Sequence, residues 1–383
     1  MIILKNADVY APEHLGKRDI LVAGNRIEKI AEHLDGYENI AEAEVIDLQG
    51  RKTVPGYIDM HEHITGGGGE KGFASRVPEA QAGILLGNGI TTVLGMLGTD
   101  GVTRSLENLV AKAYAFREEG IRAYTLTGFY GYPTPTLLEN VERDVMMIDT
   151  MIGVKTSMSD HRSSNLTAAQ LIDLATQARR GGMLSGKAGI VTIHVGPGPD
   201  MLKPLFEAVE LCDVPIQKFI PTHMGRTDAL FSEAMKFAKM GGFIDITAKN
   251  EDLEGVSAKI LRYFEQDPEN RHLTMTSDGF GSMQKYNERM EVIGYTYASP
   301  SCLHNTVRYL VQEKNVPLEL ALTLVTVNPA DVLNLKGQRG CLKENAFADI
   351  NVYDDDMNLQ YVFTEGRKAV WDHELKMRGM FEE

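Results

Sequence analysis

The sequence predicts an α/β protein that combines a (β/α)8 barrel with a small β domain formed by both ends of the chain. Two observations indicate this fold. Between about residues 52 and 342, eight apolar strand-like runs alternate with amphipathic helical runs, as in a closed barrel of parallel strands. The first 50 and last 40 residues instead hold short strand-like runs separated by turn signals. A doubly wound open sheet is the alternative arrangement of the same β/α units.

The expected elements follow one another in a regular order. The terminal strand-like runs are 2–4, 19–22, 26–30 and 43–47 at one end and 348–353, 359–364 and 368–371 at the other. The expected barrel strands are 57–63, 91–96, 122–127, 152–156, 190–195, 219–224, 243–247 and 273–278, with helices such as 105–119, 168–180 and 228–239 between them. These runs divide the chain into a β domain of residues 1–52 and 343–383 and a barrel of residues 53–342.

Composition and charge exclude several classes of function. Hydrophobic residues make up 43% of the chain and charged residues 24%, which is ordinary for a globular enzyme. The net charge of −14 argues against nucleic acids and anionic membranes as partners. The sequence has no run long enough to span a bilayer, and Cys212, Cys302 and Cys341 form no CxxC pair. Residues 1–8 lack a basic stretch followed by an apolar one, so we do not expect them to act as a secretory signal. We therefore expect a cytoplasmic protein with reduced thiols.

Candidate metal ligands stand at the carboxyl ends of the expected barrel strands. His61 and His63 end the first strand, and side chains two positions apart on a strand point to the same face, where Asp59 could support them. Later strands end in Lys155, His194, His223 and Asp278. Each of these residues alone could be an ordinary core or surface side chain. Because the strand ends of a barrel converge on one mouth, we expect all six ligands to meet there.

Six ligands of this kind are too many for one catalytic zinc ion with an open position, but they fit two divalent cations. Imidazole and carboxylate ligands suit zinc, and manganese, cobalt and iron are the alternatives. A protonated lysine has no lone pair with which to bridge two cations. A lysine carboxylated by CO2 has two oxygens that could bridge them, but residue chemistry alone does not suggest this modification. On its own, Lys155 would more often be the buried partner of a salt bridge.

The chain resembles the amidohydrolase superfamily and, within it, the isoaspartyl (β-aspartyl) dipeptidases. The resemblance covers nearly the whole chain and rests on residues 54–63 (VPGYIDMHEH), 61–70 (HEHITGGGGE), 98–100 (GTD), 126–130 (LTGFY), 153–155 (GVK), 159–162 (SDHR), 221–226 (PTHMGR), 277–282 (SDGFGS) and 328–330 (NPA). It implies a distorted barrel with a small β-sandwich and a homo-oligomer, with an octamer as the expected state. The segment after Ser282 departs from the family pattern, and Glu62 should point away from the metals.

The resemblance also implies roles for the candidate residues. His61, His63 and Asp278 would hold one metal ion, His194 and His223 the other, and carboxylated Lys155 would bridge them. A hydroxide between the metals would attack an amide carbonyl, with Asp278 as general base and then general acid. Tyr130 would donate a hydrogen bond to the oxyanion, although it could instead pack in the core with its hydroxyl on a backbone carbonyl.

The resemblance implies a β-aspartyl dipeptide as the substrate, and the charged residues near these ligands match such a zwitterion. Glu70 is placed to bind its ammonium group, and Arg162 and Arg226 to bind the carboxylate of the leaving residue. The Gly68 amide, Thr99 and Ser282 would hold the aspartyl carboxylate. Gly68 and Gly69 belong to a glycine-rich substrate-binding loop, residues 66–69, that leaves room for close backbone approach. The arginines could instead form surface salt bridges, and the glycines a lid without substrate contact.

The predicted function is therefore the hydrolysis of β-aspartyl dipeptides by two metal ions. A cyclic amidohydrolase, such as a dihydroorotase or hydantoinase, would use the same ligands but needs no carboxylate for an ammonium, so Glu70 separates the two hypotheses. A non-catalytic scaffold on the same fold is a third hypothesis, which the complete ligand set weakens.

Overall fold

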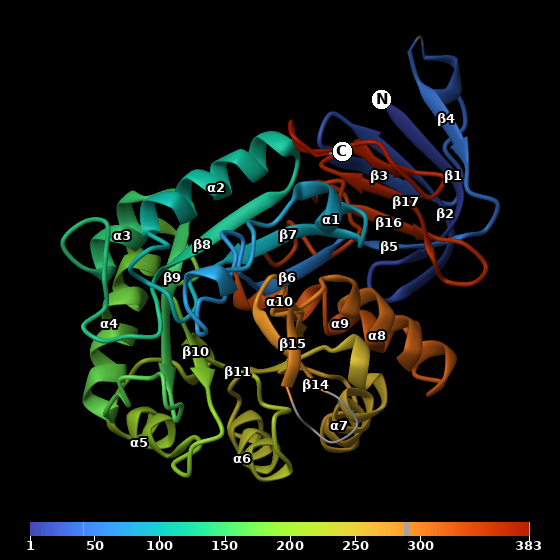
Figure 1. Ribbon diagram of the computed structural model, residues 1–383. Coiled ribbons are helices and arrows are strands. Elements are labelled where there is room, and N and C mark those ends of the chain that lie inside the picture. The colour runs from blue at the N-terminus through green and yellow to red at the C-terminus, as the bar shows by residue number, and fades with distance from the viewer. Residues whose placement is uncertain (41, 287–291, 383) are drawn as a thin grey trace.

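The chain folds into a β/α barrel beside a β-rich terminal domain, so the predicted fold class is confirmed (Figure 1). The computed structural model describes residues 1–40, 42–286 and 292–382. Both termini lie at the end of the molecule that the terminal sheet occupies, away from the helices α4 to α7 (Figure 1).

The barrel consists of eight parallel strands, each of which overlaps a predicted strand. They are β6 (Tyr57–Glu62), β7 (Ile90–Gly95), β8 (Arg122–Gly128), β9 (Met151–Met158), β10 (Ile190–Val195), β11 (Phe219–Thr222), β12 (Ile244–Thr247) and β13 (Leu273–Thr276). Every residue of β6, β7, β9 and β10 is buried. Helices cover the outer face and side chains fill the inner face, so successive residues of these strands do not alternate between buried and exposed.

The barrel is distorted because its hydrogen bonding is not continuous. Strands β6 to β11 form one six-stranded sheet, while β12 and β13 form a separate pair. The amide of Met224 bonds to the carbonyl of Asp245 at 3.0 Å, and the amide of His63 bonds to the carbonyl of Gly279 at 2.9 Å. These bonds close the ring beside two candidate ligands, His223 and Asp278.

Helices surround the barrel strands. They are α1 (Ala82–Leu86), α2 (Leu106–Glu119), α3 (Val141–Met147), α4 (Ala168–Ser185), α5 (Lys203–Leu211), α6 (Asp228–Lys239), α7 (Leu253–Gln266), α8 (Ser301–Gln312), α9 (Leu318–Thr323) and α10 (Val327–Val332), with short 3-10 turns η1 (Tyr37–Asn39), η2 (Phe73–Ser75), η3 (Ile216–Lys218) and η4 (Asn250–Asp252). Helix α4 begins with a capping box between Thr167 and Gln170. It runs beyond the predicted end at residue 180 because Gly181 and Gly182 pack directly on neighbouring backbone. None of the described helices has the length and apolar character needed to cross a membrane.

Both ends of the chain contribute to a nine-stranded mixed sheet. Its strands are β1 (Ile2–Tyr10), β2 (His14–Ala23), β3 (Arg26–Ala31), β4 (Glu44–Asp47), β5 (Lys52–Pro55), β16 (Ile350–Tyr353), β17 (Leu359–Thr364), β18 (Arg367–Trp371) and β19 (Glu374–Leu375). Antiparallel pairing of β5 with β16 joins the two ends of the chain and places the sheet next to β6. The domain limits 1–52, 53–342 and 343–383 stay a prediction.

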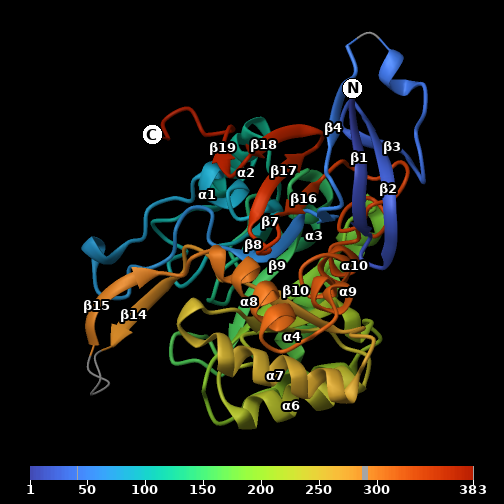
Figure 2. The same ribbon diagram turned by 90° about the vertical axis from the view of Figure 1, so that its right-hand side faces the viewer.

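A hairpin projects from the mouth of the barrel (Figure 2). It consists of β14 (Ser282–Tyr286) and β15 (Val292–Tyr297), paired in antiparallel register. This is the segment where the sequence departs from the family pattern, and its tip, residues 287–291, lies outside the described residues. Stacking of Phe280 on Tyr297, with ring centroids 5.1 Å apart, anchors its base beside the candidate site.

Candidate metal centre and substrate cavity

The six predicted metal ligands meet at the carboxyl ends of the barrel strands. The His61 ring centroid lies 5.4 Å from that of His63 and 5.0 Å from that of His223, and the His194 centroid lies 4.6 Å from that of His223. Possible ligand atoms of His61, His223 and Asp278 lie within 4.8 Å of one another. Lys155 Nζ lies 3.3 Å from His61 Nε2, which is 3.4 Å from Asp278 Oδ1.

An unsatisfied nitrogen atom indicates that this cluster fits a divalent cation. In the part of the chain that the structure describes, His223 Nε2 is buried without a hydrogen-bond partner. Burial of a polar atom without a partner is costly, and a metal ion would remove that cost by accepting the lone pair of a neutral imidazole. Burial also lowers the pKa of His61 and His223 well below the usual value, so both rings are neutral, as metal binding requires.

Threonine side chains orient two of these imidazoles. Thr222 Oγ1 donates a hydrogen bond to Asp245 at 2.7 Å and lies 3.2 Å from His61 Nδ1. It therefore accepts a hydrogen bond from Nδ1–H of His61, and Nε2 of that ring faces Lys155 and Asp278. Thr247 Oγ1 lies 2.7 Å from His223 Nδ1, which leaves Nε2 of that ring unpaired. Each hydroxyl thus turns a nitrogen lone pair toward the centre.

Lys155 lies fully buried between these histidines. Burial lowers the pKa of its ammonium group to about 7, although the negative charges of Asp278 and Asp245 oppose the shift. A large fraction of the side chain is therefore a neutral amine near neutral pH. This is the form that reacts with CO2, so the environment suits carboxylation of Lys155.

Asp278 stands at the boundary between the metal ligands and the open cavity. Burial alone would raise the pKa of its carboxyl group, but the hydrogen bond from His63 at 3.1 Å and the nearby amino group of Lys155 hold the pKa well below its usual range. Asp278 has a φ of 53° and His223 a φ of 69°. Left-handed backbone at non-glycine residues costs about 1–3 kcal/mol each and is typical of functional sites.

His194 lies between Tyr130, which the sequence analysis predicted to be catalytic, and Asp160, for which it predicted no role. Its Nδ1 accepts a hydrogen bond from the Tyr130 hydroxyl at 2.6 Å, and its Nε2 lies 2.9 Å from Asp160 Oδ2. Tyr130 therefore contacts a predicted metal ligand and not a backbone carbonyl through its hydroxyl. Burial raises the pKa of Tyr130 above its usual value, so the hydroxyl keeps its proton.

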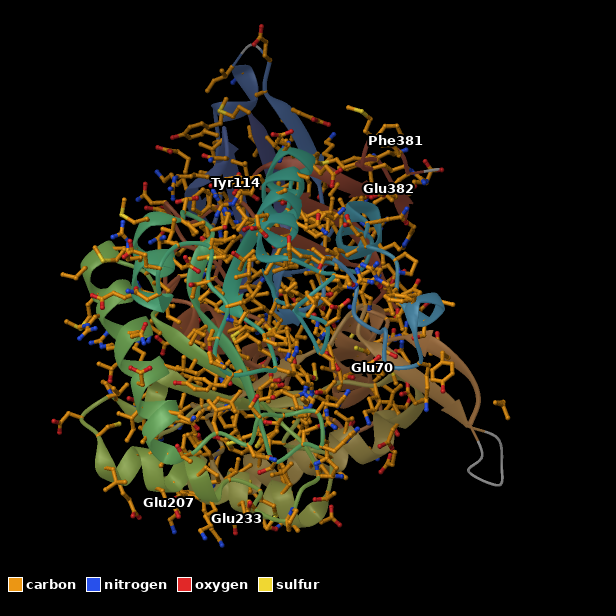
Figure 3. All side chains as sticks on the ribbon, turned by 60° about the vertical axis from the view of Figure 1, so that its left-hand side comes forward. Glu70, Tyr114, Glu207, Glu233, Phe381 and Glu382 are labelled. Carbon is orange, nitrogen blue, oxygen red and sulfur yellow. The ribbon has the colours of Figure 1, made fainter. Side chains whose placement is uncertain are left out.

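A cavity of about 1070 Å³ opens above this cluster. Its wall contains His223 and Asp278 together with predicted substrate-binding residues, namely Glu70, Arg162, Arg226 and Ser282. Glu70 Oε1 lies 3.4 Å from Arg162 Nη1 and accepts a hydrogen bond from Thr99 at 3.3 Å. Figure 3 shows Glu70 in its loop beside the base of the β14–β15 hairpin. The residues predicted to bind the ammonium group and the carboxylate of the substrate, Glu70 and Arg162, therefore face each other in one cavity.

The glycine-rich loop after β6 is built by close backbone contact. Gly68 has a φ of 81°, and a Cβ atom there would lie 2.4 Å from the carbonyl oxygen of Ser75. The next residue, Gly69, has a φ of 100° and donates its amide to the same carbonyl at 3.1 Å. Glycine is required at position 68 because any side chain would push Ser75 away and displace the neighbouring Glu70.

Two acidic residues near the ligands hold backbone and side-chain groups. Asp59 accepts hydrogen bonds from the amides of His61, at 3.0 Å, and Ser277, and so it supports the strand end instead of an imidazole ring. Glu62 is buried and accepts a hydrogen bond from Ser277 Oγ at 3.1 Å.

Sequence reasoning missed Thr222, Thr247, Asp245 and Asp160 as partners of ligands. Thr222 stands immediately before His223 and Asp160 two residues before Arg162, but only their contacts reveal which ring each one orients.

A β/α barrel with four histidines, a lysine and an aspartate at its mouth defines the class of metal-dependent barrel hydrolases. Comparison with known proteins agrees with this assignment and names the family. Residues 53–370 match the amidohydrolase family, and the chain belongs to it. Members of this family generally bind divalent metal ions.

Solved structures similar to this chain include a beta-aspartyl dipeptidase from the thermophilic keratin-degrading Fervidobacterium islandicum AW-1. That structure is a complex with a beta-Asp-Leu dipeptide, is 38% identical in sequence and superposes with a TM-score of 0.90 over 98% of each chain. A D-hydantoinase structure, at 18% identity and a TM-score of 0.69, covers 99% of this chain and 97% of its own and shares the fold.

Curated relatives include the dihydroorotase of Fusobacterium nucleatum. It is 31% identical over 122 residues, which are 31% of this chain and 27% of that protein. The match therefore spans only about a quarter of the relative's length, whereas the similarity to the dipeptidase structure spans almost the whole of both chains.

Proposed function

We propose that this enzyme hydrolyses β-aspartyl dipeptides with the help of two divalent cations, for which zinc is the metal we expect. The observation that carries the proposal is the presence of Glu70, Arg162 and Arg226 in one cavity with candidate metal ligands. The cations would be held by His61, His63, His194, His223, Asp278 and a carboxylated Lys155.

The charges of the cavity match those of the substrate. A β-aspartyl dipeptide carries one ammonium group and two carboxylates. Glu70 would bind the ammonium, and Arg162 and Arg226 the carboxylate of the leaving residue. In the free protein Glu70 and Arg162 lie 3.4 Å apart, so each partly neutralises the other until a zwitterion enters between them. Thr99, Ser282 and the Gly68 amide would hold the aspartyl carboxylate, while the Gly69 amide, which donates to Ser75, shapes the loop.

The protein side chains would then manage protons and charge. When bound, the two cations would lower the pKa of a water molecule near neutrality and polarise the scissile carbonyl. Asp278, which is ionised and open to the cavity, would accept the proton of the attacking water and deliver it to the leaving amine. Tyr130 keeps its proton and, once His194 Nδ1 binds metal, would donate its hydrogen bond to the oxyanion.

The test is hydrolysis of β-Asp-Leu beside α-Asp-Leu, with zinc and bicarbonate supplied. We expect cleavage of the β-linked peptide only, with loss of activity when a chelator removes the metal. Cleavage of neither peptide by protein that holds two metal ions per chain would contradict the proposal. Protein that binds no metal after reloading with zinc would instead support the non-catalytic scaffold.

The second candidate function is hydrolysis of a cyclic amide, which the local similarity to dihydroorotase favours. Dihydroorotate is therefore the control substrate in the same assay. Activity on dihydroorotate without activity on β-Asp-Leu would replace the first proposal by the second.

The family resemblance also leads us to propose a homo-oligomer, with an octamer as the expected state. Light scattering coupled to size-exclusion chromatography measures this directly, and a monomeric mass at assay concentration would contradict it.

A further inference from the structure

We propose that Asp160 is a positioning residue that couples the metal centre to the substrate cavity, because one carboxylate holds both His194 and Arg162. The part of this proposal that concerns His194 depends only on the metal centre, whereas the part that concerns Arg162 rests on the proposed dipeptidase function.

The contacts of Asp160 use both of its oxygen atoms. Oδ2 lies 2.9 Å from His194 Nε2 and accepts a hydrogen bond from Arg162 Nη2 at 2.9 Å. Oδ1 accepts hydrogen bonds from Arg162 Nε and from the Arg162 amide, each at 2.9 Å. The Asp160 side chain is only 1% exposed, so these bonds form away from water, where charged hydrogen bonds are strong.

The same contacts determine the orientation of His194. Nε2 donates its proton to Asp160, so Nδ1 carries the lone pair, and this nitrogen indeed accepts from Tyr130 at 2.6 Å. A carboxylate that accepts the distal N–H fixes the tautomer of a metal-binding histidine and makes it a better ligand. Asp160 therefore presents Nδ1 of His194 to a cation.

The surrounding backbone is shaped to place Asp160 at this point. Ser159 has a φ of 53°, and its carbonyl accepts the amide of Gly198 at 2.7 Å. A Cβ atom on Gly196 would lie 2.5 Å from Asp160 Cβ. Because strands β9 and β10 are paired up to Val195 and Met158, this tight contact locks the loop that carries Asp160 against the strand that carries His194.

The guanidinium group of Arg162 is aimed by the same carboxylate. Its Nε and Nη2 face Asp160, and this leaves Nη1 directed at Glu70 on the cavity wall, at 3.4 Å, and at Thr99, at 3.5 Å. Arg162 also lies over the Tyr130 ring, with 5.4 Å between the guanidinium carbon and the ring centroid. A shift of Asp160 would therefore disturb a metal ligand and a substrate-binding cation together.

The first measurement is zinc affinity of Asp160→Asn by competition with a chelator, without any substrate. We expect about 10–100-fold weaker binding at one of the two metal sites, the loss that follows removal of a supporting carboxylate. Asp144→Asn is the matched control, since Asp144 is equally buried and holds Thr127 Oγ1 at 2.6 Å and two loop amides. It should lower the melting temperature but keep the zinc affinity.

The second measurement is KM for β-Asp-Leu and for β-Asp-leucinamide, which lacks the leaving carboxylate. Asp160→Asn should raise KM for the acid on the order of tenfold and change KM for the amide much less, because Arg162 is no longer aimed at the carboxylate. Asp160→Glu keeps the charge but displaces both partners, so it should also raise KM for the acid. This variant replaces Asp160→Asn in the experiment if the asparagine variant does not fold.

Wild-type zinc affinity and an unchanged KM ratio in both variants would overturn the proposal. Equal losses in the Asp160 and Asp144 variants would also overturn it, by assigning Asp160 a purely structural role. If the wild-type protein leaves β-Asp-Leu intact, the dipeptidase function fails, while the zinc measurement still decides whether Asp160 positions His194.

Discussion

At the scale of single residues, Lys155 is the ligand whose chemistry depends most on its surroundings. Lys155→Met keeps the apolar stem and removes the amine. We expect fewer than two metal ions per chain and a loss of kcat of roughly a thousandfold or more, since the second cation supplies several kcal/mol of transition-state stabilisation. Elemental analysis and the β-Asp-Leu assay measure both. Lys187→Met is the control, because that lysine donates to the Val145 and Ile148 carbonyls outside the site.

Glu70 is the residue that decides between the two candidate substrates. Glu70→Gln should lower kcat/KM for β-Asp-Leu by roughly 10–150-fold, which corresponds to the 1.5–3 kcal/mol of a charged hydrogen bond, and leave any activity on dihydroorotate unchanged. Glu251→Gln removes the same charge from the α7 side of the cavity and should have little effect. An unchanged kcat/KM for the dipeptide in Glu70→Gln would rule out ammonium binding by this residue.

At the scale of elements, His304 on α8 connects the barrel to the terminal sheet. The Tyr57 hydroxyl on β6 is hydrogen-bonded to His304 Nδ1 at 3.0 Å and is in contact with Tyr353 on β16. Burial lowers the pKa of His304 to about 4, against about 6.5 in the unfolded chain. The unfolded chain therefore binds the proton more tightly, and stability present above pH 6.5 is lost as the pH falls toward 4.

The measurement for His304 is the free energy of unfolding in urea at pH 7 and pH 5. Between pH 7 and pH 5, the free energy of unfolding of the wild-type protein should fall by about 2 kcal/mol more than that of His304→Gln. The reason is that only the wild type has an imidazole here, which takes up a proton more readily in the unfolded chain than in the folded one. Equal losses in the two proteins would mean that protonation of His304 does not destabilise the fold.

At the scale of the whole molecule, a buried ion-pair group ties the β-rich domain to the barrel. Arg339, 1% exposed and downstream of α10, pairs with Asp349 and Glu365 and lies 3.9 Å from the Phe347 ring centroid. The carbonyl of Asp349 accepts the amide of Gly56 at 2.8 Å, one residue before β6. The group therefore lies where the terminal sheet meets the first barrel strand.

Arg339→Met should destabilise the protein by about 3–5 kcal/mol, because Asp349 would remain buried without its cation. Asp349→Asn added to this variant should recover part of the loss. Arg180→Met, which breaks the exposed pair with Glu142, should cost about 0–1 kcal/mol. Urea unfolding measures all three, and similar losses for Arg339→Met and Arg180→Met would contradict the role of the buried group.

Much of the fold could be predicted because it depends on local pattern. The bounds of α6, residues 228–239, agree with the prediction, since Thr227 caps the helix and apolar residues recur at helical spacing. Convergence of the six ligands was also predictable, because parallel strands of a barrel end at one mouth. The continuation of α4 to Ser185 was not predictable, because packing of Gly181 and Gly182 on neighbouring backbone overrides their poor helix propensity.

The sequence by itself determined the order of the strands, the residues at their ends and the charges available for a substrate. Only the tertiary structure decided which groups are hydrogen-bonded to one another. Asp59 accepts from backbone amides, Asp160 binds both His194 and Arg162, and Thr222 orients the ring of His61. The physical reason is that strand periodicity is a short-range property of the chain. Hydrogen bonds between strand ends and loops, in contrast, depend on backbone positions that are set only when the whole barrel closes.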